Sequence, residues 1–193
     1  MHIAWLGKKT PFCGNVTYGR EITSALINRG HQVSFMHFAD TKADGDDVSL
    51  PFLYKSQVFT IPTIRAKRVL ERSLRRRKPD IVHASLSLSP LDFLLPEICQ
   101  ELDLPLISTL HTPYDGKRRN VTSTTQLLAY QLYAPFLAKY DRTIIFSEEQ
   151  QDLLVKLGVS RDRTIVIPNG VDEQKYSPGI SNIRAEFNAK QIY

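Results

Sequence analysis

Short apolar runs and longer segments with helical spacing alternate along the chain. The apolar runs are rich in branched and aromatic residues, which is typical of strands buried within a sheet. We predict strands at His2–Leu6, Gln32–Phe38, Asp80–Ala84, Leu106–Leu110, Arg142–Phe146 and Thr164–Ile167, with shorter pieces at Leu50–Tyr54 and Val58–Ile61.

Between these runs, apolar residues recur three or four positions apart, as they do along one face of a helix. The first helix carries Ile22 and Leu26 and ends at Gly30, a residue type that commonly terminates helices. Further helices are predicted at Ile64–Arg77, Leu91–Leu102, Thr124–Tyr140 and Glu148–Leu157. Alternating strands and helices predict the α/β fold class, with a doubly wound, mostly parallel, Rossmann-like sheet.

In such sheets, ligands bind in the loops that follow the carboxyl ends of the strands. The loop after the first strand lacks the G-x-G-x-x-G fingerprint and the upstream glycine of a P-loop. No acidic residue follows about 20 positions later, which disfavours a nucleotide-dependent oxidoreductase. Gly14 remains at the head of a helix, where free amides and the helix dipole would favour an anion. An ordinary strand-to-helix turn is the alternative interpretation.

The composition is that of a globular protein. The chain has 193 residues, of which 42% are hydrophobic and 23% charged, so it can form a sizeable core. No apolar run approaches the roughly 20 residues of a membrane span, and the N-terminus has no pattern of a secretory signal, so we expect a cytoplasmic protein. Cys13 and Cys99 have no partners at metal-ligand spacing, and we expect two free thiols.

The positive charge is concentrated in one segment. The net charge is +5, but residues 61–79 alone carry +7, so that the remainder is about −2. The cations of the predicted helix in this segment are Arg65, Lys67, Arg68, Arg72, Arg75, Arg76 and Arg77.

Three interpretations of this basic helix are open. A solvated charged face is the simplest. A nucleic-acid site is the weakest, because no aromatic residues interleave with the arginines to stack on bases, and no nucleic-acid partner is expected. A membrane-surface helix is the third, with Ile64, Val69, Leu70 and Leu74 opposite the cations. An anionic lipid surface attracts such cations by about 1 kcal/mol each, which would hold the protein peripherally at the inner face of a membrane.

Four segments, in this order, resemble those of one enzyme family. They are Cys13-Gly14 with Ile22, Leu26 and Gly30-His31-Gln32-Val33; Lys78–Ala84; Tyr140–Ser147; and Ile167-Pro168-Asn169-Gly170-Val171-Asp172 with Tyr176 and Pro178. This pattern is similar to that of family-four glycosyltransferases of the GT-B fold, and its last segment is the most specific. One departure is Cys13, which stands where the family has the first glycine of a pair.

The resemblance implies a division of labour between two domains. Residues 1–172 would form the N-terminal, acceptor-side Rossmann-like domain, and residues 173–193 the linker into a C-terminal donor domain that holds the nucleotide sugar. The implied reaction is transfer of a sugar to an acceptor hydroxyl with retention and without a metal or other cofactor. We expect these 193 residues to be inactive alone, and the basic helix favours a lipid acceptor. A non-catalytic Rossmann-like binding module is the alternative.

The resemblance also implies roles for individual residues. His111 is expected at the reacting centre, bonded to a sugar hydroxyl. Gly14, Asn169 and Gly170 are expected at the donor phosphate and the cleft, and Asn15, Asp115 and Ser147 on the acceptor side. His83 lies inside a strand pattern and is predicted to belong to the core or to support the site from behind.

Overall fold

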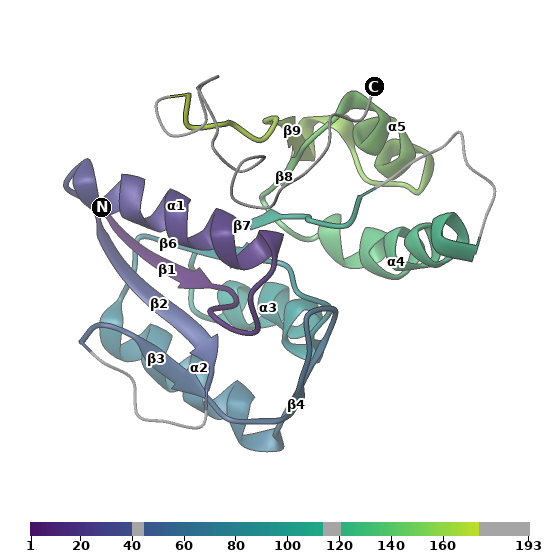
Figure 1. Ribbon diagram of the computed structural model, residues 1–193. Helices are drawn as coiled ribbons and strands as arrows, with labels where there is room; N and C mark the ends of the chain where they lie inside the picture. Colours follow the sequence, from purple (N-terminus) through teal and green to yellow (C-terminus); the bar gives the residue numbers. More distant parts are fainter. Residues whose placement is uncertain (40–44, 114–120, 174–193) are drawn as a thin grey trace, which may run out of the picture.

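A parallel sheet forms the centre of the molecule. The computed structural model describes residues 1–39, 45–113 and 121–173. Within them, seven strands are hydrogen-bonded in the order β3-β2-β1-β6-β7-β8-β9, and all neighbours run parallel (Figure 1). The strands are β1 (His2–Leu6), β2 (Gln32–Phe38), β3 (Val48–Leu50), β6 (Ile81–Ser85), β7 (Leu106–Thr109), β8 (Arg142–Ile145) and β9 (Thr164–Val166). The predicted fold class is confirmed.

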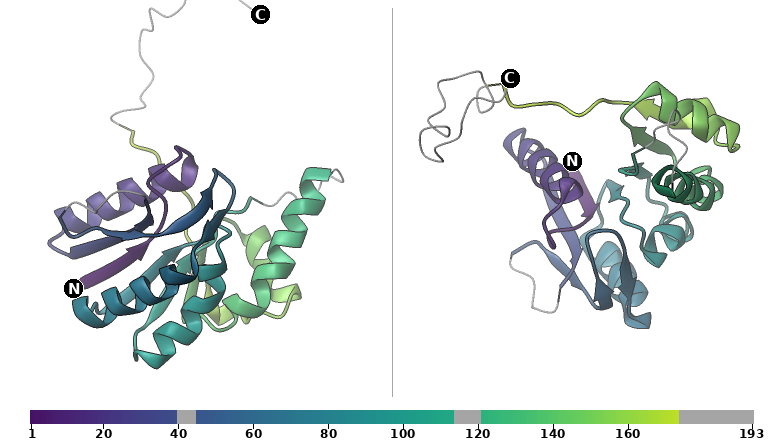
Figure 2. Two further views of the ribbon diagram at one scale, coloured as in Figure 1. Left: turned by 90° about the horizontal axis from the view of Figure 1, so that it is seen from below. Right: turned by 45° about the vertical axis from the view of Figure 1, so that its right-hand side comes forward.

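Helices connect the strands and cover the sheet. They are α1 (Gly14–Asn28), α2 (Ile64–Arg77), α3 (Pro90–Glu101), α4 (Val121–Leu137) and α5 (Glu148–Lys156), with a 3-10 turn at Arg161–Arg163. Helix α1 lies on one face of the sheet, and α2 and α3 lie on the other (Figures 1 and 2). Among the described helices, none is long and apolar enough to span a bilayer.

The strand order reverses between β1 and β6. The chain moves from β1 outward to β2 and β3, and then returns to continue at β6 on the other side of β1. The loops that leave β1 and β6 therefore diverge to opposite faces of the sheet. Such a switch point leaves a crevice at the carboxyl edge, where open α/β sheets bind their ligands.

A small hairpin separates β3 from α2. Sequence pattern predicted one strand over Leu50–Tyr54, but Leu50 ends β3, and the antiparallel pair β4 (Phe52–Lys55) and β5 (Thr60–Pro62) follows. Pro51 stands between the two strands and has no N–H to donate to a ladder. Its carbonyl accepts a bond from Thr63 N at 3.1 Å, which closes the base of the hairpin.

The core fills the space between the sheet and its helices. Ala4, Val82 and Ile145 of the sheet are each 1% exposed or less, and so is Leu70 of α2. These residues belong to one continuous apolar cluster. Because helices cover the central strands, these strands are short and mostly apolar, which is why their pattern is readable in the sequence.

Candidate functional site

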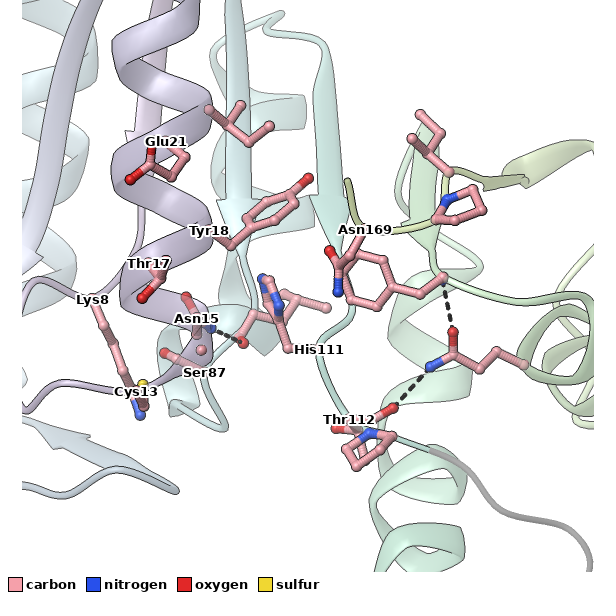
Figure 3. A pocket seen from close by; sticks show the side chains of 18 of the residues that line it. Lys8, Cys13, Asn15, Thr17, Tyr18, Glu21, Ser87, His111, Thr112 and Asn169 are labelled. Atoms are coloured by element: carbon pink, nitrogen blue, oxygen red, sulfur yellow. Dashed lines mark hydrogen bonds between the residues drawn. The ribbon is translucent and has the colours of Figure 1, made fainter. Parts of the chain in front are cut away.

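The loops after β1, β6, β7, β8 and β9 border one cleft of about 1430 Å³. Six of the residues predicted from the sequence line it, and they come from parts of the chain more than 150 positions apart (Figure 3). They are Gly14, Asn15, His111, Ser147, Asn169 and Gly170. Asp115 lies outside the described residues. The roles of these residues remain predictions, but the structure brings the six together.

Helix α1 begins in this cleft without a side-chain cap. Its N-cap residue is Cys13, whose side chain makes no capping bond. A Cβ placed on Gly14 would meet nothing within 4 Å, so the first turn is open to the cleft. By contrast, α3 begins with a complete capping box formed by Ser89 and Asp92. The open first turn of α1 is therefore suited to an anion.

Ser147 and Gln150 form a capping box at the start of α5, as Ser89 and Asp92 do at α3. Ser147 Oγ accepts a bond from Gln150 N at 3.3 Å, and Gln150 Oε1 accepts from Ser147 N at 3.1 Å. Gln150 Nε2 also donates to Thr112 O at 2.9 Å, and Tyr130 Oη donates to the same carbonyl at 2.6 Å. These bonds tie down the backbone directly after His111.

His111 is held from behind by two polar side chains. Its Nε2 lies 2.8 Å from Ser85 Oγ, and Ser85 Oγ donates to Asn15 Oδ1 at 2.8 Å. Asn15 Nδ2 in turn donates to Leu86 O at 3.0 Å. These contacts join the start of α1, the end of β6 and the loop after β7.

Aromatic rings flank the imidazole of His111. Tyr18 meets it edge-on with ring centroids 4.9 Å apart, and Phe146 lies at 5.5 Å. Burial among these groups lowers the pKa of His111 to about 4. The ring is therefore neutral near pH 7, and it can take part in hydrogen bonding or accept a proton.

His83 lies deeper, on β6. It is 6% exposed, and its ring packs on Trp5 with centroids 4.0 Å apart. Its Nε2 lies 2.9 Å from Thr109 Oγ1, which is also 3.3 Å from Tyr18 Oη. Burial, followed by the nearby His111, lowers the pKa of His83 to about 3. The buried position predicted for His83 is confirmed.

Three residues of the site had no individual role assigned from the sequence. Tyr18 follows Gly14 by one helical turn, so the helical period could have placed it on the same face. Ser85 ends β6, and Lys8 follows β1, so both satisfy the strand-end rule. Lys8 Nζ donates to Ser56 O at 3.2 Å and to Gln57 O at 2.9 Å, which anchors the β4–β5 hairpin beside the cleft.

The basic helix α2 lies away from the cleft, and the structure corrects its predicted apolar side. Leu70 and Leu74 are 0% and 1% exposed and belong to the protein core, so they cannot face lipid. Arg77 also turns inward, with bonds to Ser34 Oγ at 3.0 Å and Asp46 Oδ1 at 3.3 Å. The amphipathic pattern of α2 therefore arises from the packing of its apolar side chains in the protein core.

A cationic surface nevertheless remains on α2. Lys67 pairs with Glu71 at 3.6 Å. The exposed cations of the helix are Arg65, Arg68, Arg72, Arg75 and Arg76. The hairpin and the helix start, which precede these cations in the chain, carry exposed apolar side chains: Leu53, Val58 and Ile64 are 74%, 67% and 92% exposed.

No metal centre is evident in the part of the chain that the structure describes. Within those residues, no three His, Cys, Asp or Glu side chains gather in a group that could hold a metal ion. Cys13 and Cys99 are free thiols, and Cys99 is buried in the core.

Comparison with known proteins places the chain in a family. The sequence model described as Glycosyltransferase Family 4 matches residues 14–175. The chain belongs to this family. No curated protein sequence matches it.

Solved structures of several glycosyltransferases share the fold. Sucrose-phosphate synthase from Thermosynechococcus elongatus is 16% identical with a TM-score of 0.63, over 98% of this chain and 53% of that chain. Anabaena HepE in complex with UDP-glucose is 20% identical with a TM-score of 0.63, over 97% and 50%. WaaG, a glycosyltransferase involved in lipopolysaccharide biosynthesis, is 16% identical with a TM-score of 0.61, over 99% and 52%. The chain thus spans about half the length of these GT-B structures.

Proposed function

We propose that this chain is the acceptor-side half of a glycosyltransferase that moves a sugar from a nucleotide sugar to an acceptor hydroxyl with retention. The observation that carries the proposal is the cleft at the switch point of the sheet, which collects Gly14, His111 and Asn169. Family membership supports the reaction class, and the UDP-glucose complex of HepE supports a nucleotide sugar as donor.

In this proposal, the open first turn of α1 faces the donor phosphates. Transfer breaks the bond between the anomeric carbon and the phosphate oxygen, so negative charge grows on the departing nucleoside diphosphate. Backbone amides at a helix N-terminus stabilise such charge without reorganising. Asn169 and Gly170 line the opposite wall, and His111 contacts a hydroxyl of the sugar near the reacting carbon. Asn15, Asp115 and Ser147 remain candidates for the acceptor side.

A second domain, beginning within or after residues 173–193, would supply the main grip on the nucleotide. The proposal predicts no metal requirement and no turnover by the 193 residues alone. The test is an assay of the protein extended by its second domain, with several nucleotide sugars and both lipid and soluble acceptors. Product with the donor's anomeric configuration, determined by NMR, is the expected result. Transfer by the 193 residues alone would contradict the division of labour, and inversion would contradict retention.

We further propose that the acceptor is a lipid and that the protein docks on an anionic membrane. The support is the set of exposed cations on α2 and the exposed apolar residues Leu53, Val58 and Ile64, which precede them in the chain. The hairpin that carries Val58 also borders the cleft, so a docked surface would hold the cleft close to a lipid headgroup. Each cation near an anionic surface contributes about 1 kcal/mol.

Liposome flotation tests the membrane proposal. The double variant Arg72→Gln/Arg76→Gln is expected to bind anionic vesicles roughly 30-fold more weakly, because two contributions of about 1 kcal/mol are lost. The matched control Arg29→Gln/Lys156→Gln removes the same charge from exposed positions on other elements and should bind as the native chain does. Equal binding to neutral and anionic vesicles would refute the proposal.

A further inference from the structure

The hydrogen bonds that join Leu86, Asn15, Ser85 and His111 determine which atom of each pair carries the proton. Asn15 Nδ2 lies 3.0 Å from the carbonyl oxygen of Leu86, which can only accept a hydrogen bond. The amide of Asn15 must therefore present its nitrogen to Leu86 and its oxygen to Ser85, because the reverse orientation would set two acceptors against each other. The orientation of this side chain follows from its neighbour.

The single hydroxyl proton of Ser85 is then assigned. Ser85 Oγ lies 2.8 Å from Asn15 Oδ1, which has no proton, so Ser85 must donate to it. Ser85 Oγ also lies 2.8 Å from His111 Nε2 and has no second proton to offer. His111 must therefore donate its Nε2–H to Ser85 Oγ.

The other ring nitrogen of His111 is left with its lone pair. Among the residues that the structure describes, no hydrogen-bond partner of Nδ1 is found, and Nδ1 is not one of the buried unsatisfied atoms. It is therefore reached from the cleft that His111 lines (Figure 3).

We propose that Asn15 and Ser85 are positioning residues that hold His111 as the Nε2–H tautomer, so that Nδ1 accepts a hydrogen bond from a hydroxyl of the bound substrate. That this hydroxyl belongs to a sugar rests on the proposed function. The assignment of the tautomer does not depend on that function. A phosphate dianion or a carboxylate has no proton to donate and does not suit this position. The lowered pKa of His111 agrees with a neutral ring at pH 7. Asn15 thereby acts through His111, and both of its polar atoms have partners within the protein.

Long-range proton–nitrogen NMR on the ¹⁵N-labelled 193-residue chain at pH 7 reads the tautomer directly. We expect His111 to show Nε2 protonated and Nδ1 unprotonated, with no detectable population of the other tautomer. A dominant Nδ1–H tautomer would overturn the proposal.

Three variants make the test stringent, because free imidazole already prefers Nε2–H modestly. Asn15→Leu removes the acceptor of the Ser85 proton, so Ser85 can turn and donate to Nε2, and a measurable share of Nδ1–H should appear. Ser85→Ala removes the contact altogether and should also allow both tautomers, whereas Ser85→Thr keeps the hydroxyl and should restore the native state. Identical tautomer populations in the native chain and in both Asn15→Leu and Ser85→Ala would overturn the proposal.

A matched control and an internal reference guard against misfolding. Ser24→Ala removes an exposed hydroxyl from the same helix as Asn15 and should leave His111 unchanged. The signals of His83, whose partner is Thr109, should remain native-like in every variant that folds.

Activity provides a separate outcome. In the extended enzyme, Ser85→Ala is expected to lower kcat about tenfold or more, and Ser85→Thr should recover most of it. If no sugar transfer is found while the tautomer behaves as described, the proposed function fails and the positioning of His111 by Asn15 and Ser85 stands. If transfer occurs but the tautomer is Nδ1–H, the proposed positioning of His111 fails and the proposed function stands.

Discussion

His83 lies on β6 and His111 lies just after the neighbouring strand β7; their partners are related, yet their surroundings differ. His83 is in the middle of β6 and reaches Thr109 on β7, whereas His111 follows β7 and reaches Ser85 at the end of β6. Both rings are neutral near pH 7, since burial lowers their pKa values to about 3 and about 4. Electrostatics therefore does not distinguish them.

Access to the cleft does distinguish them. His83 is sealed beneath Trp5, while His111 lies beyond the end of its strand and lines the cleft. The comparison shows that two histidines with similar bonds and similar pKa shifts differ in their access to the cleft, according to whether they lie within a strand or beyond its end. Side-chain chemistry alone would assign them the same role.

Removing the ring at the cleft should have the largest effect. In the extended enzyme, His111→Ala is expected to lower turnover on the order of 100-fold, because the proposed function places His111 against the reacting sugar. Stability should fall less than in His83→Ala. His31→Ala, outside the cleft, is the matched control for the assay. Native turnover by His111→Ala would remove His111 from the reacting centre.

Removing the sealed ring should act on stability instead. His83→Ala leaves a cavity against Trp5 and takes the bonding partner from Thr109 Oγ1. We expect a loss of about 2–4 kcal/mol in the free energy of unfolding, measured by urea denaturation. His31→Ala again serves as control, and an unchanged midpoint in His83→Ala would contradict the assigned packing role.

Acid should destabilise the fold through both histidines. Unfolded histidines take up a proton near pH 6.5, whereas these two do so only near pH 3 and pH 4. The unfolded state therefore binds more protons between pH 4 and 6.5, so stability rises with pH across that window and levels off above it. Each histidine contributes a slope of up to about 1.4 kcal/mol per pH unit.

The difference between the native chain and His83→Gln isolates one of these contributions. Urea denaturation from pH 7 to 4.5 should show a shallower dependence for the variant. Asp92 acts in the opposite direction, because burial raises its pKa, but its contribution cancels in this difference. Parallel pH profiles would show that His83 is not kept neutral by burial.

The smallest effect is expected for Tyr18, which contacts both the partner of His83 and the ring of His111. Tyr18 Oη lies 3.3 Å from Thr109 Oγ1, and the Tyr18 ring lies against His111. Tyr18→Phe removes the long hydrogen bond and keeps the ring, so the cost should be about 0.5 kcal/mol by urea denaturation. NMR of both imidazoles should show unchanged tautomers. A change at either ring would mean that His83 and His111 are coupled through the Tyr18 hydroxyl.

The order of strands and helices was predictable because a sheet covered by helices demands apolar runs, whatever its detailed packing. The gathering of Gly14, His111 and Asn169 at one edge followed from the same topology, since parallel strands all end there. The hairpin β4–β5 was misread because an apolar run does not reveal which sheet it joins. Pro51 was the available signal for that break.

The partners of the two histidines could not be predicted from the sequence. Thr109 and Ser85 each lie 26 positions from the histidine that they bond, and only the alignment of β6 against β7 brings them together. Likewise, the pattern of α2 indicated that Leu70 and Leu74 are buried on one side, but not that protein rather than lipid covers them.

For this chain, the sequence by itself determined the α/β class, the family and the loops that border the cleft, because these depend on local periodicity and short motifs. Only the tertiary structure decided which histidine is sealed and which is open, and which hydroxyl each one meets. The reason is physical: burial and hydrogen-bond geometry depend on strand order and alignment, which join residues distant in the sequence.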